Sequence, residues 1–287
     1  MKEMFFATDL HGKPQRYKKL FDIILDKKPA MVFLGGDLLP HMLHQDKDLQ
    51  LKNNNFTLDF IGENLQKLKD KMKEEYPSIF AIMGNDDARI YEGSFIELDE
   101  NELWYYSHNR RIEINGYDIF GYAYVPPTPF LLKDWERYDV SRYVDPGCIH
   151  PTEGKRSVEV KENHIEHSTI SEDLENLTKD QDLSKAILLF HSPPYETDLD
   201  RAGLDGRKID HVPMDVHVGS IAIRRFIEQK QPMLTLHGHI HESTKLTGKW
   251  KCRINNTHCF QGAHHGKELS VIKFDPENLE SSKRDLM

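Results

Sequence analysis

The chain has few cysteines and no long apolar run, and each shortage excludes a class of protein. Its 287 residues include only three cysteines, Cys148, Cys252 and Cys259, with no C-x-x-C pair, so a disulfide framework is not expected. Cys259 is better explained as a buried strand residue than as a metal ligand. No apolar stretch is long enough to cross a bilayer, and no signal-peptide segment precedes the first apolar run. These absences predict a cytoplasmic protein with no membrane partner.

Basic residues are outnumbered, which limits the partners that the protein is expected to have. The 38 lysines and arginines face 47 acidic residues, giving a formal net charge of -9. A general nucleic-acid binder needs a basic face, so a nucleic-acid polymer is not an expected partner, whereas a local basic pocket for a phosphate is compatible with this balance. No Pro/Gly/Ser-rich linker and no repeat divides residues 1–287, so we predict a single domain. The composition leaves a homo-oligomer open.

Apolar runs alternate with amphipathic stretches over the first ninety residues. Residues 4–8, 31–34 and 79–83 are apolar and short, which is typical of buried strands. Residues 14–26 and 56–73 carry apolar side chains at helical spacing, and Pro14 suits a first helical turn. This alternation predicts parallel strands joined by crossover helices.

The remainder is predicted to consist mainly of short strands, with two helices and one long insertion. Largely antiparallel strands are expected at 103–107, 110–114 and 117–123, with Asn115-Gly116 as a hairpin turn. Further strands are expected at 186–190 and 233–236, and antiparallel strands at 242–247, 250–255, 257–260 and 268–274. Helices are expected at 171–180, with Ser171 as the N-cap, and at 221–230, with Ser220 as the N-cap. Residues 126–170 contain several prolines and little helical periodicity, so we predict an insertion that covers a functional site.

Five motifs contain residue types that bind metals, and each follows an apolar run. They are Asp9-Leu10-His11, Gly35-Gly36-Asp37, Gly84-Asn85-Asp86-Asp87, His191 and Gly238-His239-Ile240-His241. Side chains at the carboxyl ends of neighbouring buried strands converge in space. The motifs therefore predict a metal centre.

The number of candidate ligands indicates two ions rather than one. The motifs supply two carboxylates, one amide and four imidazoles, which exceeds the four ligands of a structural zinc site. Mixed nitrogen and oxygen ligands suit Mn, Fe, Zn or Co. Two such ions, about 3.5–4 Å apart, clamp phosphoryl oxygens and activate a shared water. The sequence shows no nucleophilic serine or cysteine motif, so a phosphoryl-enzyme step is not expected.

The ordered series DLH, GGD, GND, H and GHIH resembles the calcineurin-like metallophosphoesterase family, and its motifs span most of the chain. The resemblance implies an α/β fold in which two mixed β-sheets pack as a sandwich flanked by helices, with four layers in the order α/β/β/α. It further implies one ion held by Asp9, His11 and His241, a second held by Asn85, His191 and His239, and Asp37 as the bridge between them.

The chain departs from the family pattern at Asp86, where many relatives have a histidine that stabilises the transition state or protonates the leaving group. A carboxylate is a poor donor at neutral pH unless burial or a second carboxylate, such as Asp87, raises its pKa. We therefore expect either a leaving group that departs unaided or another donor. His217 is the leading candidate for that donor, so Asp86 and His217 are the two candidate catalytic residues. The N–H groups of the helix that follows His217 are a further candidate phosphate site.

The expected function is hydrolysis of a phosphate ester by a metal-bridging hydroxide. The absent histidine favours a small phosphodiester or an activated phosphomonoester, and the aromatic and basic insertion favours a nucleotide. Asn85, Arg142 and Arg156 are the candidate substrate-binding residues. Two alternatives stand beside this hypothesis. One is a catalytically weak scaffold or protein-interaction module on the same fold, and the other is a structural metal protein with closed sites.

Other aromatic and histidine residues have simpler interpretations. We expect His108 to be a solvated surface residue and His237 to support the structure around the last motif. For Trp135 and Tyr138, stacking on a base and packing under the insertion are equally favoured. His264 is assigned to a turn between glycines.

Overall fold

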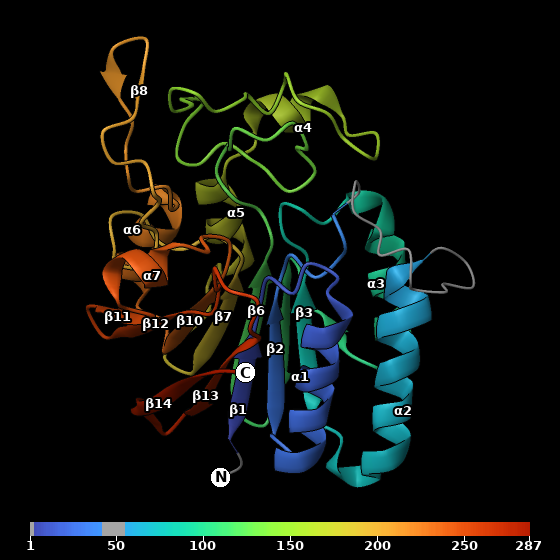
Figure 1. The fold of residues 1–287 in the computed structure, drawn as a ribbon. Coiled ribbons are helices and arrows are strands. Elements are labelled where there is room, and N and C mark those ends of the chain that lie inside the picture. The colour runs from blue at the N-terminus through green and yellow to red at the C-terminus, as the bar shows by residue number, and fades with distance from the viewer. Residues whose placement is uncertain (1–2, 42–54) are drawn as a thin grey trace.

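Two six-stranded β-sheets pack face to face between layers of helices (Figure 1). The computed structural model describes residues 3–41 and 55–287. The first sheet runs in the order β14 (Asn278–Leu286), β13 (Ser270–Asp275), β1 (Met4–Ala7), β2 (Met31–Gly35), β3 (Ser78–Ile82) and β4 (Tyr105–Tyr106). The second runs in the order β11 (Lys251–Ile254), β12 (Thr257–Gln261), β10 (Leu234–His237), β7 (Ala186–Phe190), β6 (Tyr117–Tyr122) and β5 (Arg110–Ile114). The predicted sandwich of two mixed sheets is confirmed.

The strands predicted from apolar runs lie at the centres of the two sheets. β1, β2, β7 and β10 are buried along their whole length, because both faces of each sheet are covered. β1, β2 and β3 pair in parallel, and so do β6, β7 and β10. The carboxyl ends of the strands that carry motifs therefore meet at one edge of the sandwich.

Amphipathic helices cover the outer faces of the sheets. α1 (Pro14–Lys27) begins at its proline and buries Tyr17, Leu20 and Ile24, which lie on one helical face. It is joined on the first sheet by α2 (Glu63–Met72) and α3 (Glu92–Glu100), while α5 (Ile170–Leu177) and α6 (Ile221–Lys230) lie beside the second sheet (Figure 1). Ser220 caps α6 as predicted, since its hydroxyl accepts the N–H of Ile223.

Aromatic side chains fill the space between the two sheets. Phe33 stacks on Phe80 at a ring-centroid distance of 5.3 Å and lies 6.1 Å from Phe274. Phe274 in β13 meets Phe260 in β12 at 6.0 Å, edge to face, so the contact crosses from one sheet to the other. Such pairs add specific geometry to the apolar burial that holds the strands together.

Three local predictions were wrong. Residues 242–247 form a short helix, α7 (Ser243–Thr247), rather than a strand, because the chain turns away from the sheet after the last motif. Helix α5 starts one residue earlier than expected: Thr169, not Ser171, is the N-cap, and its hydroxyl accepts the N–H of Glu172. β12 is antiparallel to β11 as predicted, but it is parallel to β10 on its other side.

One predicted helix is divided in the structure, and several other elements were not predicted. The helix expected over 56–73 consists of a π-helical segment, Thr57–Gly62, followed by α2 and a 3₁₀ turn, Lys73–Glu75. The other elements missed are a 3₁₀ turn at Arg89–Tyr91, α3, α4 (Glu162–His167), β14 and the hairpin of β8 (Lys208–Ile209) with β9 (Val212–Pro213). The Asn115-Gly116 hairpin turn is present, with φ of 51° and 80°.

The segment 126–170 lies above the carboxyl ends of the strands, with α4 at the top of Figure 1. A buried carboxylate, Asp134, attaches it to the body by accepting the N–H group of Arg89 at 2.8 Å, and within the segment it accepts the N–H group of Ser157 at 2.9 Å. Within the described ranges, no helix has both the length and the apolar character needed to cross a membrane.

Candidate active site

The loops that follow β1, β2 and β10 are held in an uncommon backbone conformation. Asp9, His11, Asp37 and His239 all have positive φ, between 48° and 73°. The first two loops are also tied together, because Asp9 N donates to Gly36 O at 2.9 Å and His11 N donates to Asp37 O at 2.8 Å. Non-glycine residues with positive φ concentrate at functional sites, where the surrounding structure offsets the local strain.

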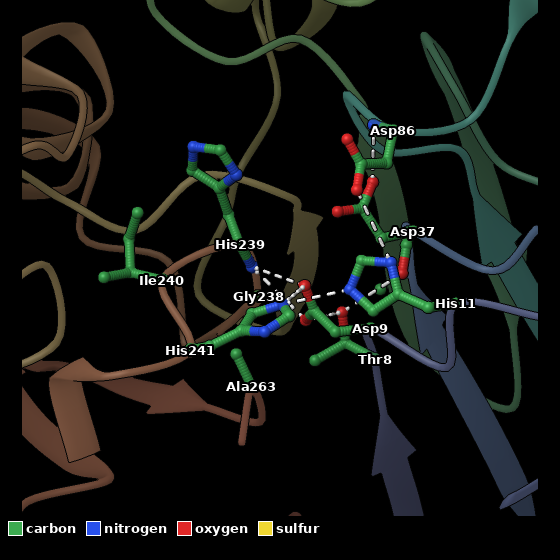
Figure 2. A network of polar contacts seen from close by, with 12 residues as sticks. Thr8, Asp9, His11, Asp37, Asp86, Gly238, His239, Ile240, His241 and Ala263 are labelled. Carbon is green, nitrogen blue, oxygen red and sulfur yellow. Dashed lines mark hydrogen bonds and ion pairs between the residues drawn. The ribbon is translucent and has the colours of Figure 1, made fainter. Parts of the chain in front are cut away.

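One group of candidate ligands consists of Asp9, His11 and His241. His241 Nε2 lies 3.0 Å from Asp9 Oδ1 and 3.1 Å from His11 Nε2. Figure 2 shows the two rings turned toward each other beside the carboxylate. Three groups that bind metals through lone pairs therefore face one point.

A second group consists of Asp37, His191 and His239, with Asn85 beside it. His191 Nδ1 lies 2.8 Å from Gly35 O, and because a carbonyl only accepts, this nitrogen carries the proton. Its Nε2 lies 3.1 Å from Asn85 Oδ1 and 3.3 Å from Asp37 Oδ2. Burial lowers the pKa of His191, but the charge and hydrogen bond of Asp37 outweigh it and raise that pKa to about 10, so a proton lies at Nε2 between these oxygens. A cation would take the place of that proton, because a metal binds the neutral imidazole.

Asp37 lies between the two groups. It also forms a group with His11 and Asp86, whose candidate ligand atoms are all within 4.8 Å of one another. Its side chain is therefore close to members of both ion sites implied by the family resemblance. The donor set, with oxygen and imidazole ligands divided into two adjoining groups, fits two borderline divalent ions.

Gly84 makes room for this arrangement. A Cβ atom at this position would lie 2.2 Å from Asp37 Oδ1 and 2.7 Å from His191 Cε1. Gly36, with φ of 93°, is similar, because a Cβ there would lie 2.7 Å from His191 Nδ1. The glycines of the second and third motifs thus let the backbone approach the candidate ligands closely.

Burial and mutual charge set the electrostatics of the site. Burial raises the pKa of Asp9, but the hydrogen bond and charge of His241 outweigh it and hold that pKa below its ordinary value. Burial likewise raises the pKa of Asp37, and the charge and hydrogen bond of His191 lower it further than burial raises it. Both carboxylates are thus kept ionised, as metal ligands must be.

Asp86 and Asp87 have different surroundings. Burial, followed by the charge of Asp37, raises the pKa of Asp86 to about 6. Its carboxylate lies 3.6 Å from His11 Nδ1, and its backbone N–H donates to Asp37 Oδ1 at 2.9 Å (Figure 2). Asp87 is fully buried and accepts the N–H groups of Leu38, Leu39 and Gly84, so it supports the loops rather than facing the candidate ligands.

Residues that no motif indicated also hold the site in place. The Thr8 hydroxyl donates to Asp9 Oδ2 at 2.7 Å. Arg16 is buried, and its guanidinium donates to Asp9 O and to Gly266 O, each at 2.6 Å. Gln261 donates to Gly238 O at 2.9 Å. A basic residue on the first helix was the only sequence signal for Arg16, and surface charge explains such a residue equally well.

The other predicted site residues have their described contacts elsewhere. His217 pairs with Asp200 through its Nδ1 atom at 2.8 Å. Arg142 is exposed, with its guanidinium 6.0 Å from the ring centre of Tyr138. Arg156 donates to Pro151 O at 2.6 Å within the insertion. None of the contacts described for these three side chains reaches a candidate metal ligand, so their roles toward substrate stay predictions.

The helix that follows His217 does not offer free N–H groups to a phosphate. Asp139 of the insertion takes them: its carboxylate accepts from Ile221 N at 2.7 Å, from Ala222 N at 3.2 Å and from the Ser220 hydroxyl at 2.5 Å. The sequence-based suggestion of a phosphate site at this helix was therefore wrong, because an anion from the same chain already fills it.

His108 is half-buried and packs against aromatic residues that belong to the interior. His108 packs edge-on against Trp135 at a centroid distance of 4.9 Å and accepts Ala123 N at 3.0 Å, so the expectation of a solvated surface residue was wrong. Trp135 and Tyr138 are buried, at 0 % and 1 % exposure, which favours packing over stacking on a base. Buried His237 is hydrogen-bonded to Ser192 O, in agreement with a supporting role.

The order and geometry of these motifs agree with a comparison against known families. Residues 4–243 match the family model described as calcineurin-like phosphoesterase. The chain belongs to this family. Membership confirms the resemblance inferred from the motifs, together with the prediction that this phosphoesterase is a metal-dependent enzyme. No protein among the curated sequences matches it.

Solved structures show the same fold at low identity. The phosphoesterase is similar to TT1561 of Thermus thermophilus, with a TM-score of 0.55, 15% identity, and coverage of 99% of this chain and 98% of that chain. It is also similar to an archaeal phosphodiesterase (TM-score 0.45, 10% identity, 99% of each chain) and a dimetal phosphatase from Danio rerio (TM-score 0.48, 10% identity, 94% of this chain and 92% of that chain). The last two likenesses are too distant to carry an argument.

Proposed function

We propose that this phosphoesterase hydrolyses a small phosphate ester with the help of two divalent ions. The observation that carries the proposal is the pair of adjoining ligand groups with Asp37 between them. We assign Asp9, His11 and His241 to one ion, Asn85, His191 and His239 to the other, and Asp37 to both. Two such ions, when bound, stabilise charge on the phosphoryl oxygens and supply a hydroxide nucleophile at neutral pH.

The protein's own residues divide the remaining tasks. Asn85 is proposed to contact the phosphate as well as an ion, and Arg142 and Arg156 to meet the part of the substrate that extends under the insertion. Asp86 faces His11, a candidate ligand, so it is poorly placed to serve as an independent donor. We propose His217 as the group that protonates the leaving oxygen. A nucleotide suits the basic insertion, and the three free cysteines suit a cytoplasmic location.

The test is metal-dependent hydrolysis of p-nitrophenyl phosphate and bis(p-nitrophenyl) phosphate. The metal-free protein is loaded with Mn, Fe, Co, Ni or Zn, and product release is followed by absorbance. We expect turnover to depend on metal and to fall by at least about 10²-fold in each of two variants. Asp37→Asn removes the charge of a proposed ligand, and His191→Gln removes a proposed imidazole ligand.

His264→Gln is the matched control for His191→Gln. His264 also has a carboxylate partner, Glu268 at 3.1 Å, but it lies in the turn before β13 and in none of the three candidate ligand groups. The control should keep wild-type turnover. Wild-type protein that turns over neither ester with any of these metals would favour the scaffold alternative and overturn the proposed function.

A further inference from the structure

Asp200 is a buried carboxylate with an unusually complete set of donors. It has 0 % exposure, and it accepts the N–H groups of Glu196 and Thr197 at 2.9 Å each and of Gly219 at 3.1 Å. The Thr197 hydroxyl lies 3.5 Å from Oδ1, and the imidazole of His217 completes the set, with Nδ1 at 2.8 Å from Oδ1. A buried carboxylate must be hydrogen-bonded to be tolerated, and here its charge is directed at one ring nitrogen.

This contact decides which nitrogen of His217 carries a proton. An ionised carboxylate only accepts, so Nδ1 of the neutral ring must be the protonated atom. Within the described part of the chain, Nε2 has no protein partner, and 27% of the side chain is exposed. The ring is thus fixed through one nitrogen while the other is open to solvent or to a ligand.

Both members of the pair are attached to loops that carry candidate metal ligands. Asp200 follows Leu199, and the side chain of buried Gln261 donates both to Leu199 O at 3.0 Å and to Gly238 O at 2.9 Å, next to His239. On the other side, Ser220 N donates to Pro193 O at 2.9 Å, two residues after His191. Movement of the pair relative to the metal centre is restricted from both directions.

We infer that Asp200 is the positioning residue for His217, and that the pair selects esters whose leaving group needs a proton. This inference rests on the proposed function. Such a leaving group is an aliphatic alkoxide, for example the hydroxyl oxygen of a ribose, rather than an aryloxide or a phosphate. The expected substrate is therefore an alkyl phosphate ester. An activated ester, which the absence of a histidine at position 86 had favoured, is not needed if His217 supplies the proton.

The step balances with water as the only other reactant. A water-derived hydroxide adds to phosphorus, the bond from phosphorus to the leaving oxygen breaks, and that oxygen takes the proton from Nε2 of the His217 imidazolium. The neutral ring keeps its proton on Nδ1, hydrogen-bonded to Asp200, and Nε2 regains a proton from solvent. Asp200 contributes by stabilising the imidazolium and by fixing the tautomer that remains, as a carboxylate does for a general-acid histidine elsewhere.

A comparison of leaving groups tests the inference on metal-loaded protein. One pair of esters is adenosine 5′-monophosphate against p-nitrophenyl phosphate, and the diester pair is thymidylyl-thymidine against p-nitrophenyl thymidine 5′-phosphate. We expect His217→Gln to lower kcat for the alkyl ester by about 10²–10⁴-fold and to leave kcat for the aryl ester nearly unchanged. Asp200→Asn should lower the alkyl-to-aryl ratio of kcat by about tenfold or more.

The ratio within one variant is independent of the fraction of protein that is folded. Asp215→Asn is the matched control, because Asp215 accepts the backbone N–H of His217 at 2.9 Å and its charge acts on His217, but it makes no described hydrogen bond with the ring nitrogens. It should lower the ratio far less than Asp200→Asn does. An unchanged ratio in both His217→Gln and Asp200→Asn would overturn the inference while aryl turnover upholds the proposed function; absence of turnover on every ester overturns both.

A spectroscopic measurement tests the positioning role without metal or turnover. Nitrogen-15 chemical shifts of the histidine rings distinguish the two neutral tautomers, and the His217 signals are identified by their loss in His217→Gln. We expect the Nδ1–H tautomer in wild-type protein and in Asp215→Asn, and a shift toward Nε2–H in Asp200→Asn. An Nε2–H tautomer in the wild-type protein would contradict the assignment.

Discussion

At the scale of single residues, the motifs indicate the candidate ligands but not the residues that hold them in place. Asp9, Asp37 and His239 stand in recognisable patterns after apolar runs, so chemistry and position could both be read from the sequence. Asp200 could not be found this way, because one aspartate in a loop has no periodic or spaced partner. Its importance comes from donors on four residues that only the folded chain brings together.

Gly84→Ala is expected to disrupt the proposed metal centre without replacing any candidate ligand. The added methyl group would lie 2.2 Å from Asp37 Oδ1 and 2.5 Å from Asp37 N, so the carboxylate loop must shift. We expect metal affinity, measured by titration calorimetry, to fall by about 10–100-fold or more. Gly93→Ala in α3 is the control, because a Cβ there meets nothing within 4 Å. It should keep metal affinity and stabilise the helix by about 0.5–1 kcal/mol; equal affinities in the two variants would contradict the steric argument.

At the scale of elements, the sequence predicts what local pattern determines and misses what distant contacts determine. The central strands were predicted because burial on two faces requires a continuous apolar run. Helix α6 was predicted because its N-cap serine precedes an amphipathic stretch. α7 was mistaken for a strand, because Ser243–Thr247 is too short for helical periodicity to show. The attachment of the insertion to α6 by Asp139 was also beyond reach, since 82 positions separate that carboxylate from Ile221.

Asp139→Ala is expected to loosen the start of α6 and destabilise the fold by about 1–2 kcal/mol, the usual loss for a helix N-cap. Burial raises the pKa of Asp139, so part of the gain from capping offsets the cost of burying its charge. Urea unfolding gives the loss of stability, and hydrogen exchange at Ile221 and Ala222 locates it. In a double-mutant cycle with Ser220→Ala, the two effects should not add, because the side chains share a hydrogen bond. Unchanged exchange at both amides would show that Asp139 does not accept these N–H groups in solution.

At the scale of the whole molecule, His108 lies where three parts of the fold meet. Its ring contacts Tyr106 of the first sheet, Tyr122 of the second and Trp135 of the insertion, at centroid distances of 6.3, 5.9 and 4.9 Å. Burial, with smaller effects of Arg89 and Arg137, lowers the pKa of His108 to about 3. The folded protein therefore keeps this ring neutral at pH values where an unfolded chain protonates it.

The consequence is that His108 makes the folded protein less stable in acid. Between the ordinary histidine pKa of about 6.5 and the folded value, the unfolded state binds the extra proton, so stability falls as the pH drops through this range. At pH 5 the loss attributable to His108 should be about 2 kcal/mol relative to pH 8.

His108→Gln keeps an acceptor for Ala123 N but cannot titrate, so its urea-unfolding free energy should fall less between pH 8 and pH 5 than that of the wild type. Burial also lowers the pKa of His264, a histidine in a surface turn, so His264→Gln should differ from the wild-type curve in the same direction but by less than His108→Gln. Parallel curves for His108→Gln and the wild type would mean that the ring is protonated in the fold, and the three-way packing around it would have to open to admit that charge.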